Sequence, residues 1–202
     1  MSGILAQNSG RNTGLIKASS GGGGTWNLIQ TQTASSSSTI SFTSGIDSTY
    51  NEYVFYFLNI HPSGTNRFQF NGSIDAGSNY NVTKTTTVFT SGHREADDDA
   101  TFTYQSGDDH AQSTSFQDLM AYGNQDADND HSLSGCLHLF APSDTTFIKN
   151  FMARSQGNID TDYSVNSFIS GYFNDTNDID AIRFQMSSGT IDSGTISLYG
   201  IS

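Results

Sequence analysis

Apolar and polar residues alternate in short runs along most of the chain, and the run near its C-terminal end shows the pattern most clearly. Ile182, Phe184 and Met186 alternate there with Arg183 and Gln185. Successive side chains of a β-strand point to opposite faces, so a two-residue period indicates a strand with one packed face and one wet face. A turn rich in Gly and Ser follows, and then a second apolar run. This end of the sequence therefore predicts two strands joined by a turn.

The same alternation recurs at short intervals, between turns rich in Gly, Asn, Asp and Ser. It predicts strands over residues 26–32, 39–43, 53–60, 67–74, 84–89, 100–104, 133–140, 146–153, 167–173, 179–187 and 194–200. Many short strands separated by such turns are typical of an antiparallel β-sandwich, and in particular of a jelly roll. We therefore expect an all-β fold.

One segment fits a helical period instead. Residues 113–122 place Phe116, Leu119 and Met120 on one face of a short helix. A packed loop is the alternative interpretation of this segment.

Length and composition favour one domain with an aromatic core. A β-sandwich of 202 residues buries enough surface to fold as a single unit. Only 34% of the residues are hydrophobic while 12% are aromatic, so few, large side chains are expected between the two sheets. We expect the sandwich to span residues 25–202.

Residues 1–24 form a separate N-terminal arm in this interpretation, because they end in four consecutive glycines. Glycine loses the most conformational entropy on ordering, so the glycine run predicts a flexible hinge. Two short apolar pairs and two cations in the arm could attach it to a neighbouring subunit or to a larger particle; a disordered tail is the alternative. The candidate attachment residues are Ile4, Leu5, Arg11, Leu15, Ile16 and Lys17.

The charge of the chain argues against two classes of partner. The formal net charge is −12, with only 8 Lys and Arg residues. Binding to nucleic acid relies on cationic side chains that displace phosphate counterions, and anionic membranes need the same cations. The sequence also shows no signal peptide and no run of eighteen apolar residues, so we expect synthesis in the cytoplasm without secretion. The one cysteine, Cys136, lies in an apolar run and is expected to be a small buried hydrophobe.

The candidate metal site is an acidic segment with Asp126, Asp128 and Asp130, whose spacing resembles the start of a calcium loop. A complete loop of the EF-hand type needs glycine at its sixth position and glutamate at its twelfth. His131 and Leu137 occupy those positions here. A solvated acidic loop is therefore the favoured interpretation, calcium is the alternative, and we predict no other cofactor.

No motif for catalysis stands out. The histidines lack the spacing of a zinc site, no nucleophile elbow is convincing, and no pair of carboxylates suggests glycoside hydrolysis. We therefore expect a protein that is not an enzyme. Several tyrosines could stack on sugars, but packing in the core and on the sheet is the favoured role for them; these are Tyr50, Tyr53, Tyr80, Tyr104, Tyr122, Tyr163 and Tyr172.

Three segments together carry a family resemblance. The opening SGILAQNSGRNTGLIK, the middle segment SGCLHLFAPSDTTF and the ending from residue 179 are similar to those of small virion structural proteins of tailed bacteriophages. The resemblance implies a β-rich, often jelly-roll protein located in the virion. It also implies a symmetric homo-oligomer, most simply a trimer, that decorates the capsid and contacts the major capsid protein or another virion protein.

Two alternatives to capsid decoration stay open. The first is a tail-fibre or receptor-binding head that binds a glycan on the host surface. The second is a free carbohydrate-binding module.

Overall fold

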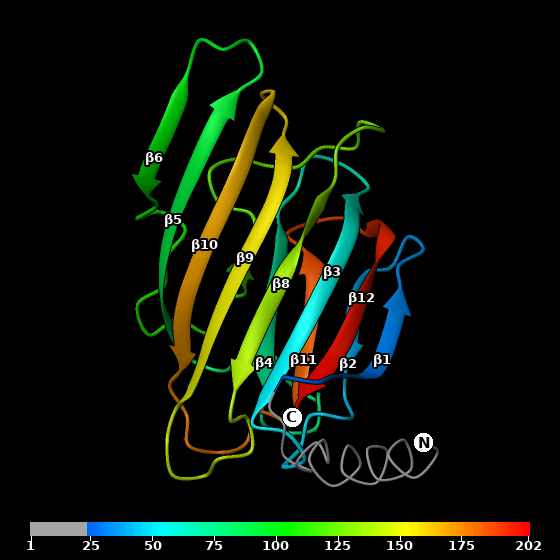
Figure 1. The fold of residues 1–202 in the computed structure, drawn as a ribbon, viewed down its shortest axis with the longest axis vertical. Coiled ribbons are helices and arrows are strands. Elements are labelled where there is room, and N and C mark those ends of the chain that lie inside the picture. The colour runs from blue at the N-terminus through cyan, green and yellow to red at the C-terminus, as the bar shows by residue number, and fades with distance from the viewer. Residues whose placement is uncertain (1–23) are drawn as a thin grey trace, which may run out of the picture.

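The computed structural model describes residues 24–202, which form two packed antiparallel sheets and no helix (Figure 1). The strands are β1 (Trp26–Thr33), β2 (Thr39–Phe42), β3 (Glu52–Pro62), β4 (Phe68–Ser73), β5 (Lys84–Arg94), β6 (Ala100–Tyr104), β7 (Gln117–Asp118), β8 (Leu133–Phe140), β9 (Lys149–Ile159), β10 (Tyr163–Phe173), β11 (Ala181–Met186) and β12 (Ile191–Ile201). The large sheet has the order β1-β12-β3-β8-β9-β10-β5-β6, and the small sheet has the order β2-β11-β4-β7. The predicted all-β sandwich is confirmed.

The strand order contains a jelly roll. Strand β1 pairs with β12, β2 with β11, β3 with β8 and β4 with β7, so the chain forms nested antiparallel pairs split between two sheets. Two hairpin-like insertions enlarge it: β5 and β6 lie between β4 and β7 in sequence, and β9 and β10 lie between β8 and β11. All four inserted strands join the large sheet beyond β8, so that sheet extends past the small one.

Phenylalanine side chains fill the space between the two sheets. Phe184 of β11 stacks on Phe68 of β4, with ring centroids 5.6 Å apart and ring planes 13° apart. The rings of Phe55 and Phe57 from β3 face this pair across the sandwich, and all four side chains are fully buried. Each buried phenylalanine contributes about 1.5–3 kcal/mol of transfer free energy. The aromatic core that the composition predicts is therefore present.

The inner face of the extended half is covered by the segment that precedes β8. Leu119, Met120 and Ala121 are buried beneath β9 and β10, and the Ala121 amide donates to the Ser167 hydroxyl at 3.1 Å. The predicted helix over residues 113–122 is wrong, and the loop interpretation is correct. The backbone there is extended, because β7 pairs with β4 and the Leu119 amide donates to the Phe68 carbonyl at 2.7 Å.

Strands β5, β9 and β10 are each longer than the hydrophobic pattern predicts. Their additional residues are mainly Ser, Thr, Gln, Asn and Gly, which lack the apolar alternation that marks the other strands. These polar strand ends lie side by side in the large sheet.

The described part of the chain starts next to its own C-terminal end. The Gly24 amide donates to the Ser202 carbonyl at 2.5 Å, so the last residue of the arm lies at the β1–β12 side of the large sheet. The six candidate attachment residues of the arm lie outside the described residues. Within residues 24–202, no helix is long and apolar enough to span a bilayer.

Candidate binding face

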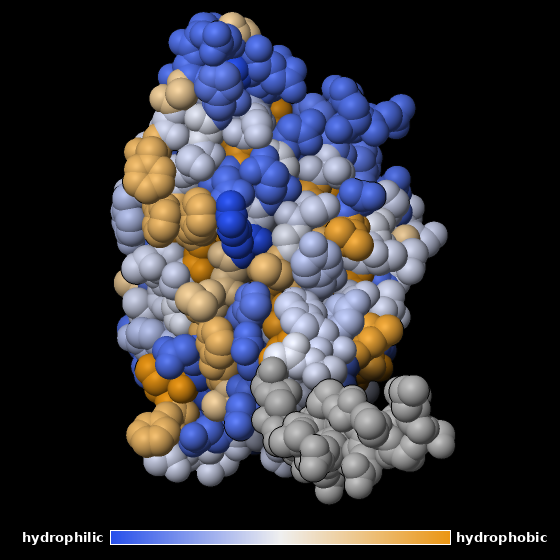
Figure 2. Space-filling view, viewed as in Figure 1, coloured by the Kyte–Doolittle hydropathy of each residue, from blue (hydrophilic) through white to orange (hydrophobic). Residues whose placement is uncertain are grey.

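The large sheet leaves one broad face uncovered within residues 24–202. In β9, side chains alternate between buried and exposed along the whole strand, with Met152, Arg154 and Gln156 on the exposed side. The small sheet and the residue 105–131 segment pack on the opposite, inner face. We call the exposed side the outer face. Figure 2 views it and shows apolar side chains gathered over β5, β6 and β10, with hydrophilic side chains above them.

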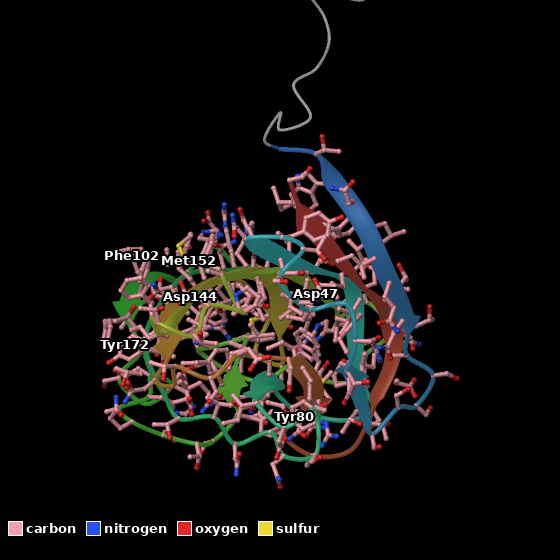
Figure 3. The ribbon with its side chains drawn as sticks, turned by 90° about the horizontal axis from the view of Figure 1, so that it is seen from below. Asp47, Tyr80, Phe102, Asp144, Met152 and Tyr172 are labelled. Atoms are coloured by element: carbon pink, nitrogen blue, oxygen red, sulfur yellow. The ribbon has the colours of Figure 1, made fainter. Side chains whose placement is uncertain are left out.

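An aromatic band crosses the outer face over the extended half of the sheet. Phe89 of β5 and Phe168 of β10 stack with centroids 5.0 Å apart, and Phe102 of β6 packs edge-on against Phe89 at 5.6 Å. Phe102 is 74% exposed and Met152 of β9 is 52% exposed. In the end view of Figure 3, Phe102 and Met152 lie on one side of the molecule and Tyr80 on the other. We define the aromatic band by its members, which are Phe89, Phe102, Tyr104, Met152 and Phe168.

Arg154 lies where the aromatic band meets the polar strand ends. It is the cross-strand neighbour of Phe168, and its guanidinium carbon lies 5.0 Å from the centre of that ring. Its Nε donates to Oδ1 of Asn166 at 3.0 Å. Among the described residues no carboxylate lies within 4.0 Å of this guanidinium. Its terminal nitrogens are therefore held in place but open to a ligand.

Hydrogen bonds continue from Arg154 across the polar ends of β9 and β10. Asn166 donates through Nδ2 to Oε1 of Gln156 at 3.1 Å, and Gln156 donates through Nε2 to the Ser164 hydroxyl at 2.9 Å. We call Arg154, Asn166, Gln156 and Ser164 the amide row. Three shallow hollows, of about 340, 200 and 370 Å³, adjoin the row, and Gln156 lines all three.

A thiol, an imidazole and a carboxylate lie together next to the band. Cys136 and His138 project from the same side of β8 into a hollow of about 330 Å³, and Nδ1 of His138 lies 2.7 Å from Oε1 of Glu52. A hydrogen bond with Cys136 and the neighbouring Glu52 carboxylate raise the pKa of His138 to about 9. The prediction that Cys136 is buried is wrong, because its position in β8 points outward and leaves it partly exposed.

The acidic segment does not gather its carboxylates around one point. Asp126 contacts Nδ1 of His131 at 2.6 Å and accepts from the Asp128 amide at 3.1 Å, while the Asp130 side chain is 89% exposed. Within the described residues no group of three His, Cys, Asp or Glu side chains could hold a metal ion. The three carboxylates of the segment therefore do not converge on one point in this structure.

Most of the tyrosines considered for sugar stacking pack into the fold. Tyr53 and Tyr80 are buried, and Tyr50, Tyr122 and Tyr163 pack against the core cluster or line its edge, so the packing interpretation is confirmed for these five. Tyr104 and Tyr172 lie on the outer face instead.

The residues of the amide row carried no sequence motif that could have identified them. They come together only because β9 and β10 pair in one particular register, which places Asn166 opposite Gln156 and Phe168 opposite Arg154. Comparison of the chain with protein-family models, with curated proteins and with solved structures finds no match.

Proposed function

We propose that this chain is a non-enzymatic structural protein of a virion, and that it decorates a capsid as a symmetric oligomer, most simply a trimer. Its partners are other copies of itself and the major capsid protein or another virion protein. Three features support the proposal: the sequence resemblance to virion proteins of tailed bacteriophages, the jelly-roll body, and the aromatic band on the uncovered outer face.

The aromatic band is the observation that carries the proposal. Soluble monomers rarely expose contiguous apolar patches larger than a few hundred Å², and such patches mark sites of association. Phe102 and Met152 are both more than half exposed, and neither belongs to the core. Burial of one such side chain against a second copy supplies about 1.5–3 kcal/mol.

The charge of the chain fits association through this band rather than through the rest of the surface. Two copies that each carry a net charge of −12 repel each other. The band itself contains no charged side chain, and Arg154 adds a cation at its border. Contact through the band therefore brings together side chains that carry no charge of their own.

The fold separates this association surface from Gly24, the last residue of the arm. The band lies over β6, β5, β10 and β9, whereas Gly24 lies beside β1 and β12, at the other end of the strand order. Copies can therefore associate through one part of the sheet while the arm engages the particle from another.

The experiment is a measurement of copy number on purified particles by quantitative mass spectrometry. Hundreds of copies per virion support capsid decoration. A few to tens of copies would favour the second candidate, a tail-fibre or receptor-binding head, which the hydrogen-bonding groups of the amide row also suit. Absence of the chain from purified particles would overturn the virion assignment.

A further inference from the structure

We infer that the amide row is a binding site for a neutral oligosaccharide. The ligand would lie in the hollows along Gln156, accept and donate hydrogen bonds with Arg154, Asn166 and Gln156, and stack one ring on a neighbouring aromatic side chain. This inference goes beyond the proposed assembly role and does not rest on it.

The polar groups of the row are held in place before any ligand arrives. Stacking on Phe168 and the hydrogen bond from Nε to Asn166 fix the Arg154 guanidinium. Asn166 and Gln156 in turn fix each other at 3.1 Å. A ligand that binds here does not have to immobilise these long side chains, so less of the binding free energy is lost to conformational entropy.

The row also keeps hydrogen-bonding capacity for a ligand. A guanidinium has five N–H donors, and the described contacts of Arg154 use only the one on Nε. Asn166 Nδ2 has two N–H groups and donates one of them, to Gln156. Sugar hydroxyls both donate and accept, so they match a surface of amides, hydroxyls and one guanidinium.

The hollows are shallow and lined mainly by polar residues, and their volumes are those of a small-ligand site. Volumes of about 340 and 370 Å³ lie within the range of about 300–1,000 Å³ that small-molecule sites occupy. Tyr56, which is 42% exposed, lines the first hollow together with Arg154 and Asn166. Phe168 borders the row on the opposite side. Tyr56 is the aromatic ring that a sugar could stack on here, because the Phe168 ring already stacks with Phe89 and with the Arg154 guanidinium.

The charge of the chain selects a neutral ligand. A net charge of −12 repels anionic polymers, including nucleic acid and acidic polysaccharides, and Arg154 is one cation against that field. Glu95 and Asp130 also line the third hollow. A neutral oligosaccharide meets no such repulsion and can still accept hydrogen bonds from the donors of Arg154 and Asn166 that the row does not use.

The test is binding of the full chain to hexasaccharides of β-1,4-linked glucose, α-1,4-linked glucose, β-1,4-linked N-acetylglucosamine and α-linked mannose, measured by calorimetry and on a glycan array. We expect binding to at least one of them. Asn166→Ala and Gln156→Ala should each weaken it about tenfold, since loss of a hydrogen-bonding partner costs about 1.5 kcal/mol. Gln185→Ala is the matched control, because Gln185 belongs to β11 in the other sheet, and it should bind as the unaltered chain does.

Two further readouts keep the test decisive. Thermal melting must show that each variant is folded, and the side-chain amide signals of Gln156 and Asn166 in NMR spectra should shift on titration with the bound hexasaccharide. Phe102→Asp, which disrupts the proposed association surface, should keep sugar binding. Failure of the chain to bind any of the four neutral sugars at millimolar concentration, binding to acidic glycans alone, or equal weakening in Gln185→Ala would overturn the inference.

Discussion

Phe89 and Phe168 stack face to face on the solvent side of the large sheet, with their ring planes only 12° apart. The pair lies directly across neighbouring strands, so the register of β5 against β10 creates it. Aromatic pairs of this kind contribute about 0.5–1.5 kcal/mol beyond their burial. The pair thus joins β5 to β10, and Phe102 extends the apolar surface to the edge strand.

The buried Lys84 predicts a stability that rises with pH. Its Nζ lies 3.0 Å from Oδ1 of Asn71, the side chain is fully buried, and burial lowers its pKa from 10.5 to about 7. A lowered lysine pKa means that the folded state disfavours the charge, so the penalty is absent above pH 10.5 and grows as the pH falls toward 7. At pH 7 it is on the order of 4 kcal/mol.

Lys84→Met should therefore stabilise the protein by up to a few kcal/mol at pH 7 and much less at pH 10.5, since it removes the buried charge. Urea denaturation at a series of pH values measures this. Lys149→Met provides the comparison, because burial also lowers the pKa of Lys149 while nearby aspartates oppose the shift. A Lys84→Met variant that is less stable than the unaltered chain at pH 7 would contradict the prediction.

His138 predicts the opposite trend with pH. Its raised pKa means that the folded state favours the imidazolium, so this contribution is complete below pH 6.5 and is lost as the pH rises through about 9. Cys136→Ala and Glu52→Gln should each lower the pKa of His138 toward 6.5. Titration of the imidazole signals by NMR measures both values. An unaltered His138 that titrates near 6.5 would show that the thiol and carboxylate do not act on it.

A single methyl group added at Gly135 should lower the stability of the fold. A Cβ at this position would overlap the backbone carbonyl of Arg154 and lie 2.8 Å from the Phe57 ring and from the Ser155 Cα. Overpacking of this kind typically costs about 1–3 kcal/mol. Gly135→Ala should lower the thermal midpoint by several degrees, as calorimetry can measure. Gly107→Ala has nothing within 4 Å of its added Cβ and should stay within about 0.5 kcal/mol of the unaltered chain.

We predict that residues 1–24 are needed for attachment to the particle but not for folding of the body. Removal of residues 1–24 should leave the thermal midpoint of the body nearly unchanged, because the sheets and the core consist of later residues. The shortened chain should no longer bind to particles that lack the protein. Co-sedimentation with such particles measures this, and unchanged attachment of the shortened chain would refute the role of the arm.

Hydrophobic alternation was enough to predict the class of fold and most of the strands. The core strands β3, β4, β8 and β11 carry Phe, Leu, Ile or Val at alternate positions, so a two-residue period marks them clearly. Residues 155–158 of β9 read Ser-Gln-Gly-Asn, and these four positions carry no apolar signal. Pairing with β8 and β10 extends it, and such long-range pairing leaves no trace in local sequence.

The candidate site could not be predicted from the sequence for the same reason. Arg154, Gln156 and Asn166 are ordinary polar residues in a chain rich in them, and only the register of β9 against β10 makes them neighbours. For Met120 the sequence pattern was misleading. Its spacing from Phe116 suggested a helix, but Met120 lies in an extended segment that packs on the inner face of β9 and β10. Tertiary packing determined both outcomes.

Sedimentation equilibrium of the full chain tests most directly whether the aromatic band joins copies of the protein. We predict a species with three times the monomer mass of 21.8 kDa, and an association constant that falls about tenfold or more in Phe102→Asp, because a buried aromatic contact supplies about 1.5–3 kcal/mol. Phe147 is 68% exposed, close to the value for Phe102, and lies outside the band, so Phe147→Asp should associate normally. A chain that stays monomeric at all concentrations, or a Phe102→Asp variant that associates as Phe147→Asp does, would contradict the account.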